Sequence, residues 1–141
     1  MTWSIFMQSL GLVFDPYVLL VIFCSALFGL FVGCIPGLTA TMATALLVPI
    51  TFFMPPVPAV AAIVTATAMA IFSGDIPGAL LRIPGTPASA AYTDEAYRMT
   101  LKGQAEVALG AGLVFSAIGG LFGTLVMIWF SPGLAEIALK F

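Results

Sequence analysis

Hydrophobic residues run almost unbroken along two stretches of the chain, 16–74 and 107–135, and neither stretch contains a charged side chain. A transmembrane helix needs about 20 mostly apolar residues to cross roughly 30 Å of hydrocarbon. The first stretch is therefore long enough for two or three crossings and the second for one. Pro36-Gly37 and Pro55-Pro56 divide the first stretch, because proline and glycine end helices.

These divisions predict apolar membrane segments over 17–35, 38–54, 57–72 and 107–130. The second and third segments are short for a full crossing, and Pro49 removes a backbone donor inside the second. Short segments interrupted by proline or glycine are typical of discontinuous helices in transporters. Kinked but continuous spans are the alternative interpretation, and the pattern alone does not choose between them.

The residues before the first apolar run predict a separate helix. Apolar residues recur at helical spacing over 1–14, but this segment is too short to span a bilayer. We expect an interfacial helix, with Trp3 at the level of the lipid headgroups. Asp15 is a good N-cap and Pro16 is tolerated at the first helical position, so the next helix is predicted to begin there.

Small residues line one face of the first predicted span. Gly29, Gly33 and Gly37 recur every four residues and form a smooth ridge that lets two helices approach closely. One interpretation is helix packing alone. The other is a ridge that leads into a broken helix after Pro36. A similar glycine stripe occurs in 107–130 and predicts packing against another helix.

Residues 73–91 combine two Pro-Gly pairs, Pro77-Gly78 and Pro84-Gly85, with polar side chains. Thr86 could cap a new helix that has Pro87 at its first position, and a helix N-terminus suits an anion. Irregular backbone at membrane depth is tolerated only inside protein or beside a water-filled cavity. The stretch is therefore either a re-entrant, cavity-lining hairpin or an ordinary aqueous loop.

Composition supports a membrane protein and excludes several other classes. Charged residues make up 7% of the 141 positions, against about 25% in ordinary soluble domains, and the mean hydropathy is +1.19. This excludes a soluble globular protein, a disordered chain and a nucleic-acid binder. The chain contains no histidine, which excludes imidazole proton relays and His-ligated metal sites within it. Cys24 and Cys34 would point to different helix faces, so we expect no disulfide.

The placement of the charges adds a topological expectation. Half of the charged residues fall within 94–106, so the segment 92–106 is predicted to be a charged, amphipathic connector at an aqueous face. Two of the four basic residues, Arg98 and Lys102, lie in this connector. The positive-inside rule therefore places it in the cytoplasm. The expected fold is an all-α integral membrane protein with about four membrane segments, forming a single transmembrane domain over 1–141.

Catalytic signatures are absent, whereas five short motifs resemble one transporter family. The chain has no nucleophile elbow, Walker loop or metal-ligand spacing, and we expect no enzyme activity and no cofactor. The motifs occur in order as Gly29-x-x-x-Gly33-x-x-Pro36-Gly37-Leu38, Ala45-Leu46-Leu47-x-Pro49-x-Thr51-Phe52, Leu80-Leu81-x-x-Pro84-Gly85-Thr86-Pro87, Tyr97-x-Met99-x-x-x-Gly103 and Ala108-Leu109-Gly110. Together they resemble the large membrane subunit of the tripartite tricarboxylate transporters, the TctA family. The resemblance covers only the N-terminal portion of that subunit.

The resemblance implies a system of three parts in the bacterial inner membrane. A periplasmic solute-binding protein would capture a carboxylate, and a small membrane subunit would accompany the large one. The large, multi-pass subunit would carry tricarboxylates or related organic anions across the bilayer by symport with a cation, Na⁺ or H⁺. The apolar segment that begins at Leu134 is also expected to continue in a longer protein.

Two residues depart from the family pattern. The usual pattern is Leu-Leu-Asn-Thr before Pro84-Gly85, and Gly-Gly-Ser near position 75, whereas this chain has Arg82 and Asp75. One hypothesis is that Asp75 and Arg82 pair across a break at Pro77-Gly78. Either could also contact a ligand near the substrate cavity, Arg82 a carboxylate and Asp75 a coupling cation. The alternative is a purely structural ion pair at a membrane face.

The predicted site is a carboxylate site between two broken-helix elements, 33–41 and 75–89. Its binding groups would be backbone N–H groups, hydroxyls and the Arg82 guanidinium, with Asp75 at the coupling ion. The predicted substrate-binding residues are Pro36, Gly37, Thr39, Arg82, Pro84, Gly85, Thr86 and Ser89. The rival hypothesis is a small membrane scaffold or assembly protein, or a truncated remnant, without transport activity.

Overall fold

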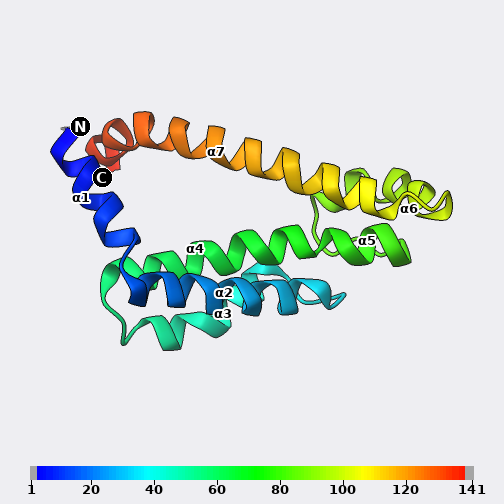
Figure 1. Cartoon of the computed structure of the whole chain (residues 1–141), viewed down its shortest axis with the longest axis horizontal. Helices are drawn as coiled ribbons and strands as arrows, with labels where there is room; N and C mark the ends of the chain where they lie inside the picture. The colour runs from blue at the N-terminus through cyan, green and yellow to red at the C-terminus, as the bar shows by residue number, and fades with distance from the viewer. Residues whose placement is uncertain (1–2, 139–141) are drawn as a thin grey trace. The chain divides into compact units, whose positions relative to one another are not determined.

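The computed structural model contains only helices as regular secondary structure in the part that it describes, which is the backbone of residues 3–138 and the side chains of 7–131, 133 and 134 (Figure 1). This confirms the predicted all-α class. The elements are α1 (Trp3–Val13), α2 (Pro16–Cys34), α3 (Ala40–Thr51), α4 (Pro56–Ser73), α5 (Asp75–Leu81), the 3₁₀ turn η1 (Ser89–Ala91), α6 (Thr93–Leu101) and α7 (Ala105–Ala138).

The first helices begin where capping chemistry predicts. Helix α2 has Asp15 as its N-cap, and the carboxylate accepts a hydrogen bond from the backbone N–H of Tyr17 at 2.8 Å. Pro16 occupies the first helical position, where its missing N–H has no partner to lose. The side chain of Trp3, the expected interfacial anchor, lies outside the described residues, as does Lys140.

Helices α2 and α4 lie parallel and pack through small residues. Gly29 faces the backbone of Ala66, and one turn later Gly33 faces the backbone of Ala70. A Cβ atom at either glycine would overlap the facing backbone, so only glycine permits this approach. The buried stripe on α4 has the same character, because it consists of Pro58, Ala62, Ala66, Ala70 and Ser73. Helix packing therefore explains the ridge formed by Gly29 and Gly33, and it also explains the small residues along the facing side of α4.

Ser73 closes this interface at the end of α4. Its side chain is fully buried, and its hydroxyl lies 3.4 Å from the carbonyl oxygen of Gly29 on α2 and 3.3 Å from that of Ala70. A buried hydroxyl needs such an acceptor, since an unpaired one would lose its hydration without compensation. The hydroxyl of Ser73 therefore has hydrogen-bond acceptors and links the backbones of α2 and α4.

Helix α3 is short and runs antiparallel to α4. It contains 12 residues, far fewer than a crossing needs, and Ala43 packs with Val32 and Ala70 in the core. Its first residue, Ala40, lines the same groove as Ile71, and its Thr44 contacts Thr67. The N-terminus of α3 therefore lies beside the second half of α4. Because α3 covers only Ala40–Thr51, the predicted segment 38–54 is helical only in part.

The helical assignment is interrupted at Gly74 and not at the predicted Pro77-Gly78 break. Pro77 and Gly78 both lie inside α5, whereas Gly74 ends α4 and precedes α5. Proline has no N–H for the carbonyl four residues earlier, and its ring clashes with that carbonyl. For Pro77 the affected residue is Ser73, so the helix is interrupted one turn before the proline. The break at Pro77-Gly78 was a wrong prediction.

Three helical stretches are long and apolar enough to cross a membrane, judged by length and composition over the described residues: Pro16–Cys34, Pro56–Leu81 and Ala105–Ser131. The second stretch joins α4 and α5 through Gly74 and contains 26 residues. The apolar segment 57–72 is therefore part of a longer span than the hydropathy pattern indicated, because α5 extends it past Asp75.

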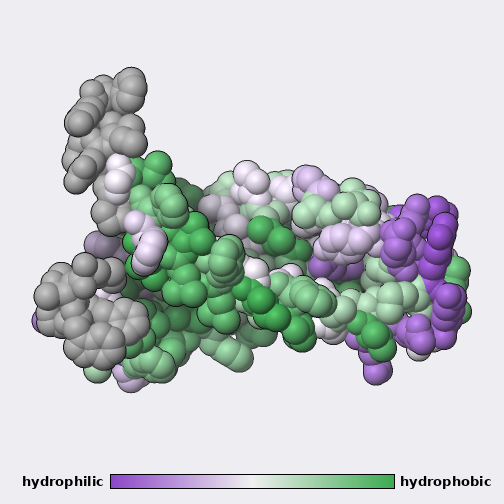
Figure 2. Space-filling view, turned by 90° about the horizontal axis from the view of Figure 1, so that it is seen from above, coloured by the Kyte–Doolittle hydropathy of each residue, from purple (hydrophilic) through white to green (hydrophobic). Residues whose placement is uncertain are grey.

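Several of the charged residues that follow α5 lie on α6. Helix α6 packs against α5 and η1 and carries Asp94 and Glu95 in its first turn and Arg98 in its last. Figure 2 shows hydrophilic residues gathered at the end of the molecule where Figure 1 labels α5 and α6.

The chain divides into two compact units, residues 1–109 and 110–141. Helices α1 to α6 and the start of α7 form the first unit. The second unit is the rest of α7, which is a single helix over its described residues. Its glycine residues Gly119, Gly120 and Gly123 have open space where a Cβ would lie.

The α2–α4 interface can be tested with glycine substitutions. Gly29→Ala should lower the free energy of unfolding by about 1–3 kcal/mol, because the new methyl group overlaps the Ala66 backbone. Gly11→Ala is the matched control, since Gly11 lies inside α1 with open space at its Cβ. It should leave stability unchanged or slightly increased. Thermal unfolding of the purified chain in detergent, followed by circular dichroism, measures both. Equal stability of the two variants would contradict the close packing.

Candidate functional site

The first predicted site element is the turn between α2 and α3. Gly37 has φ +95°, a left-handed conformation that glycine adopts without a steric penalty. Thr39 is the N-cap of α3, and its exposed hydroxyl accepts a hydrogen bond from the N–H of Met42 at 3.3 Å. The N–H groups of Ala40 and Thr41, in the first turn, have no helical acceptor. They point out of the helix beginning, where its dipole favours negative charge.

The second predicted element folds back on itself. After α5 the chain reverses at Arg82, which has φ 59° and is the only non-glycine with positive φ among the described residues. The N–H of Gly85 then donates to the carbonyl of Gly74 at 3.2 Å. A Cβ atom on Gly85 would lie against the Gly74 backbone, so glycine is required there. Residues 74–85 thus form a closed hairpin whose two ends meet at Gly74 and Gly85.

Thr86 and Ser89 satisfy each other's backbone groups. The N–H of Thr86 donates to the Ser89 hydroxyl at 3.0 Å, and the N–H of Ser89 donates to the Thr86 hydroxyl at 3.1 Å. The Ser89 hydroxyl donates in turn to the Thr86 carbonyl at 2.9 Å. This is the reciprocal geometry of a capping box. This capping box begins only a single turn that leads into η1, whereas the sequence suggested a new helix from Pro87.

This reciprocal bonding changes what the second element can offer a ligand. The N–H groups of Gly85, Thr86 and Ser89 all donate hydrogen bonds within the hairpin or within the turn that follows it. The Thr86 hydroxyl accepts one of these bonds but keeps its own proton as a donor. Pro84 supplies no N–H. The geometry therefore leaves fewer backbone donors near Pro84-Gly85 than at the start of α3.

Asp75 and Arg82 each have a partner other than the one predicted. Arg82 pairs with Asp94 on α6 through Nε and Oδ1 at 2.7 Å, and both side chains are more than half exposed. The Tyr92 hydroxyl donates to Asp75 Oδ1, also at 2.7 Å. The expected Asp75–Arg82 pair was wrong, because α6 packs against α5 and brings Tyr92 and Asp94 to these side chains.

These contacts shift the pKa values of the groups outside the span. Partial burial and the hydrogen bond to Asp75 raise the pKa of Tyr92 to about 12. The hydrogen bond and the charge of Arg82 hold the pKa of Asp94 below its usual range. The same pair raises the pKa of Arg82. At neutral pH the structure thus has a neutral phenol at Asp75 and a charged pair between α5 and α6.

The structure brings some predicted site residues together and keeps others apart. Gly85, Thr86 and Ser89 form one group against Gly74. Pro36, Gly37 and Thr39 form another at the start of α3. Among the described residues, no hydrogen bond or ion pair joins the two groups. No group of three or more His, Cys, Asp or Glu residues that could hold a metal ion occurs in the described part either.

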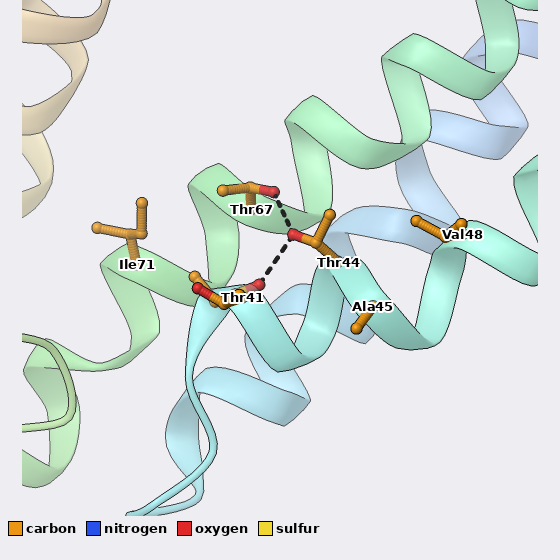
Figure 3. Close-up of a pocket in the computed structure, with 7 residues that line it drawn as sticks. Thr41, Thr44, Ala45, Val48, Thr67 and Ile71 are labelled. Atoms are coloured by element: carbon orange, nitrogen blue, oxygen red, sulfur yellow. Dashed lines mark hydrogen bonds between the residues drawn. The ribbon is translucent and has the colours of Figure 1, made fainter.

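One polar feature was missed as a site by the sequence analysis. A groove of about 430 Å³ lies between α3 and α4, and its polar side chains are Thr41, Thr44 and Thr67 (Figure 3). The Thr44 and Thr67 hydroxyl oxygens lie 3.0 Å apart. Threonines in apolar helices were the available signal, but their alignment across two helices depends on the register between α3 and α4, which the sequence does not show.

The Tyr92–Asp75 contact predicts an alkaline titration. Because the folded-state pKa of Tyr92 is raised from 10.0 to about 12, stability should fall as the pH rises between these values. Asp75→Asn should lower the pKa of Tyr92 but keep it above 10.0, since burial, the larger cause, remains. Phenolate absorbance measures the titration, and Tyr92→Phe identifies which step belongs to Tyr92. An unchanged Tyr92 step in Asp75→Asn would refute the contact.

The Arg82–Asp94 pair predicts an acid titration. The pKa of Asp94 is lowered in the folded chain, so the pair stabilises the fold above the ordinary value of 3.8 and is lost as the pH falls through the lowered pKa. Arg82→Asn should return the pKa of Asp94 towards 3.8, and Asn tolerates the left-handed backbone at this position. Carboxyl ¹³C NMR measures it. Arg98→Gln is the control and should shift Asp94 less, because Arg98 is a smaller cause.

Comparisons with known proteins identify the family of the chain. The family model described as "Tripartite tricarboxylate transporter TctA family" matches residues 19–141. The chain is also 34% identical over 119 residues to a protein of Agrobacterium vitis described as "Uncharacterized 52.8 kDa protein in TAR-I ttuC' 3'region". This alignment covers 84% of the chain but 24% of that relative, so the chain spans about a quarter of the relative's length. No solved structure matches the chain. With a family match over most of its length and three helices suited to crossing a bilayer, the chain belongs to the tripartite tricarboxylate transporter TctA family.

Proposed function

We propose that the chain forms part of the membrane subunit of a cation-coupled uptake system that moves tricarboxylates or related organic anions across the bacterial inner membrane. Its partners would be a small membrane subunit and a periplasmic solute-binding protein. The family match supports the transporter assignment, and the multi-pass helices fit a membrane component. No catalytic role is proposed.

The beginning of α3 is the observation that favours a carboxylate site. Helix α3 is too short to cross a bilayer, and its N-terminus lies beside Ile71 within the Pro56–Leu81 span. In transporters with interrupted helices, such N-termini bind anionic groups of the substrate. Here the turn at Pro36-Gly37 presents the free N–H groups of Ala40 and Thr41, and the Thr39 hydroxyl keeps a proton to donate.

The hairpin 74–85 and its capping turn supply the remaining proposed groups. Thr86 would donate its hydroxyl proton to the substrate, while Pro84, Gly85 and Ser89 would hold Thr86 in place. Arg82 would attract the carboxylate from the exposed end of α5, because its guanidinium is more than half exposed while paired with Asp94. Asp75, bonded to the Tyr92 hydroxyl, would carry the coupling ion, Na⁺ or H⁺.

A proline substitution tests the α3 donors without breaking the helix. Ala40→Pro removes one free N–H at the first helical position, where proline is tolerated. The preceding residue, Thr39, already has the extended backbone that proline requires. Losing one hydrogen bond to a charged group should weaken carboxylate affinity by about tenfold or more. Uptake of a radiolabelled tricarboxylate, by cells that express the chain with the other components of its system, measures the change.

The matched control is Ala105→Pro, which places proline at the first position of α7 and leaves α3 untouched. Its uptake should equal that of the unmodified chain. Equal affinity in Ala40→Pro and Ala105→Pro would remove α3 from the carboxylate site. Absence of uptake by the unmodified system would instead favour the scaffold hypothesis.

A further inference from the structure

The guanidinium of Arg82 uses only one of its donors in the ion pair with Asp94. Its Nε donates to Oδ1 of Asp94 at 2.7 Å. A guanidinium carries five N–H donors in a rigid planar fork, and four of them belong to the two terminal nitrogens. Within the part of the chain that the structure describes, these four donors make no hydrogen bond, and the side chain is 60% exposed. The terminal edge of Arg82 is therefore open to a ligand.

This open edge has the geometry that a carboxylate group requires. The two terminal nitrogens can donate two parallel hydrogen bonds to the two oxygens of one carboxylate. A lysine ammonium carries the same charge but cannot reproduce this fork. Because Asp94 occupies Nε, the ion pair and a bound carboxylate would use different donors of Arg82 and could exist together.

The backbone fixes where the two partners meet. Arg82 ends α5 in a left-handed conformation, and its N–H donates to the carbonyl of Gly78 at 3.2 Å. A residue other than glycine keeps such a conformation only where the surrounding structure holds it there. Asp94 lies in the first turn of α6, which packs against α5. The chain reversal thus brings Arg82 to the beginning of α6.

The ion pair is poorly suited to a purely stabilising role. Both side chains are more than half exposed, so water screens their attraction and the loss of side-chain freedom offsets much of the gain. The bond to Nε nevertheless restricts how the guanidinium can turn. Its main physical effect is therefore on the orientation of Arg82.

We propose that Asp94 is a positioning residue for substrate recognition: its carboxylate holds Nε of Arg82, so that the terminal edge of the guanidinium binds a carboxylate group of the transported anion. Asp94 itself contacts no substrate in this arrangement. The proposal rests on the proposed function, and it adds the residue that orients Arg82 and the edge of Arg82 that recognises the substrate.

The test compares two substitutions of Asp94 that differ only in the hydrogen-bond acceptor. Asp94→Asn keeps an oxygen that can accept from Nε, whereas Asp94→Ala removes it, and both remove the same negative charge. KM is measured for uptake of radiolabelled citrate, a tricarboxylate, by cells that express the chain with the other components of its system. The KM of Asp94→Ala should exceed that of Asp94→Asn by about fivefold or more, with similar Vmax, because a hydrogen bond to a charged group is lost.

Controls at Glu95 and Arg82 separate positioning from charge. Glu95→Gln and Glu95→Ala make the same pair of changes at the next residue, which forms no hydrogen bond or ion pair within the described residues, and their KM values should be equal. Arg82→Lys should raise KM, and in that background the difference between the two Asp94 variants should disappear. Equal KM values for Asp94→Asn and Asp94→Ala would overturn the proposal, because a role through charge alone affects both variants alike.

The orientation of Arg82 can also be measured without transport. ¹⁵N NMR of the purified chain in nanodiscs detects the Nε–H of Arg82, and loss of this signal in Arg82→Lys assigns it. The signal should stay near its original position in Asp94→Asn and move to that of a solvated guanidinium in Asp94→Ala. An unchanged signal in Asp94→Ala would overturn the proposal whatever the KM values.

Two further outcomes are distinguishable. Circular dichroism should give the same helix content for every variant. If Asp94→Ala loses helix content, Asp94→Ser, whose hydroxyl is too short to reach Nε, takes its place in both measurements. Absence of citrate uptake by the unmodified system would overturn the proposed function, and the substrate role of Arg82 with it, whereas the NMR result would still report whether Asp94 orients Arg82.

Discussion

The close approach of α2 and α4 is the constraint on which the rest of the first unit depends. In a bilayer the lipid tails are as apolar as the side chains, so helices associate through packing and hydrogen bonds and not through exclusion of water. Gly29 and Gly33 bring the α2 backbone against Ala66 and Ala70, and Ser73 adds a hydroxyl contact where α4 ends. This packed pair sets the register in which α3 lies, and therefore sets which threonines face one another.

Two prolines determine which backbone carbonyls lose their helical hydrogen bonds. Pro77 interrupts the α4–α5 stretch at Gly74, one turn earlier, and the chain returns to Gly74 through Gly85 after it reverses at Arg82. Pro49 has the same chemical effect on Ala45, but α3 continues past it to Thr51. One proline therefore lies inside the hairpin at the polar end of the first unit, and the other leaves a carbonyl without its helical donor in an apolar helix.

Local chemistry was readable from the sequence, and long-range geometry was not. Asp15 and Pro16 start α2 as expected, because a cap acts within one turn and needs no information about the fold. The all-α membrane class likewise follows from the long uncharged runs. The Asp75–Arg82 pair failed because Tyr92 and Asp94 reach these side chains through the packing of α6 on α5. The groove between Thr44 and Thr67 was missed for the same reason, since hydroxyls 23 positions apart meet only through helix register.

The parallel arrangement of α2 and α4 has a topological consequence. Two parallel neighbours require the chain between them to return across the same thickness, and α3 makes most of that return. The amino-terminal ends of α2 and α4 consequently share one side, where α1 contacts both helices, and α6 lies beyond the opposite end (Figure 1). If the charged segment around α6 faces the cytoplasm, α1 lies on the opposite side of the membrane. Each end of this first unit would then meet a different compartment.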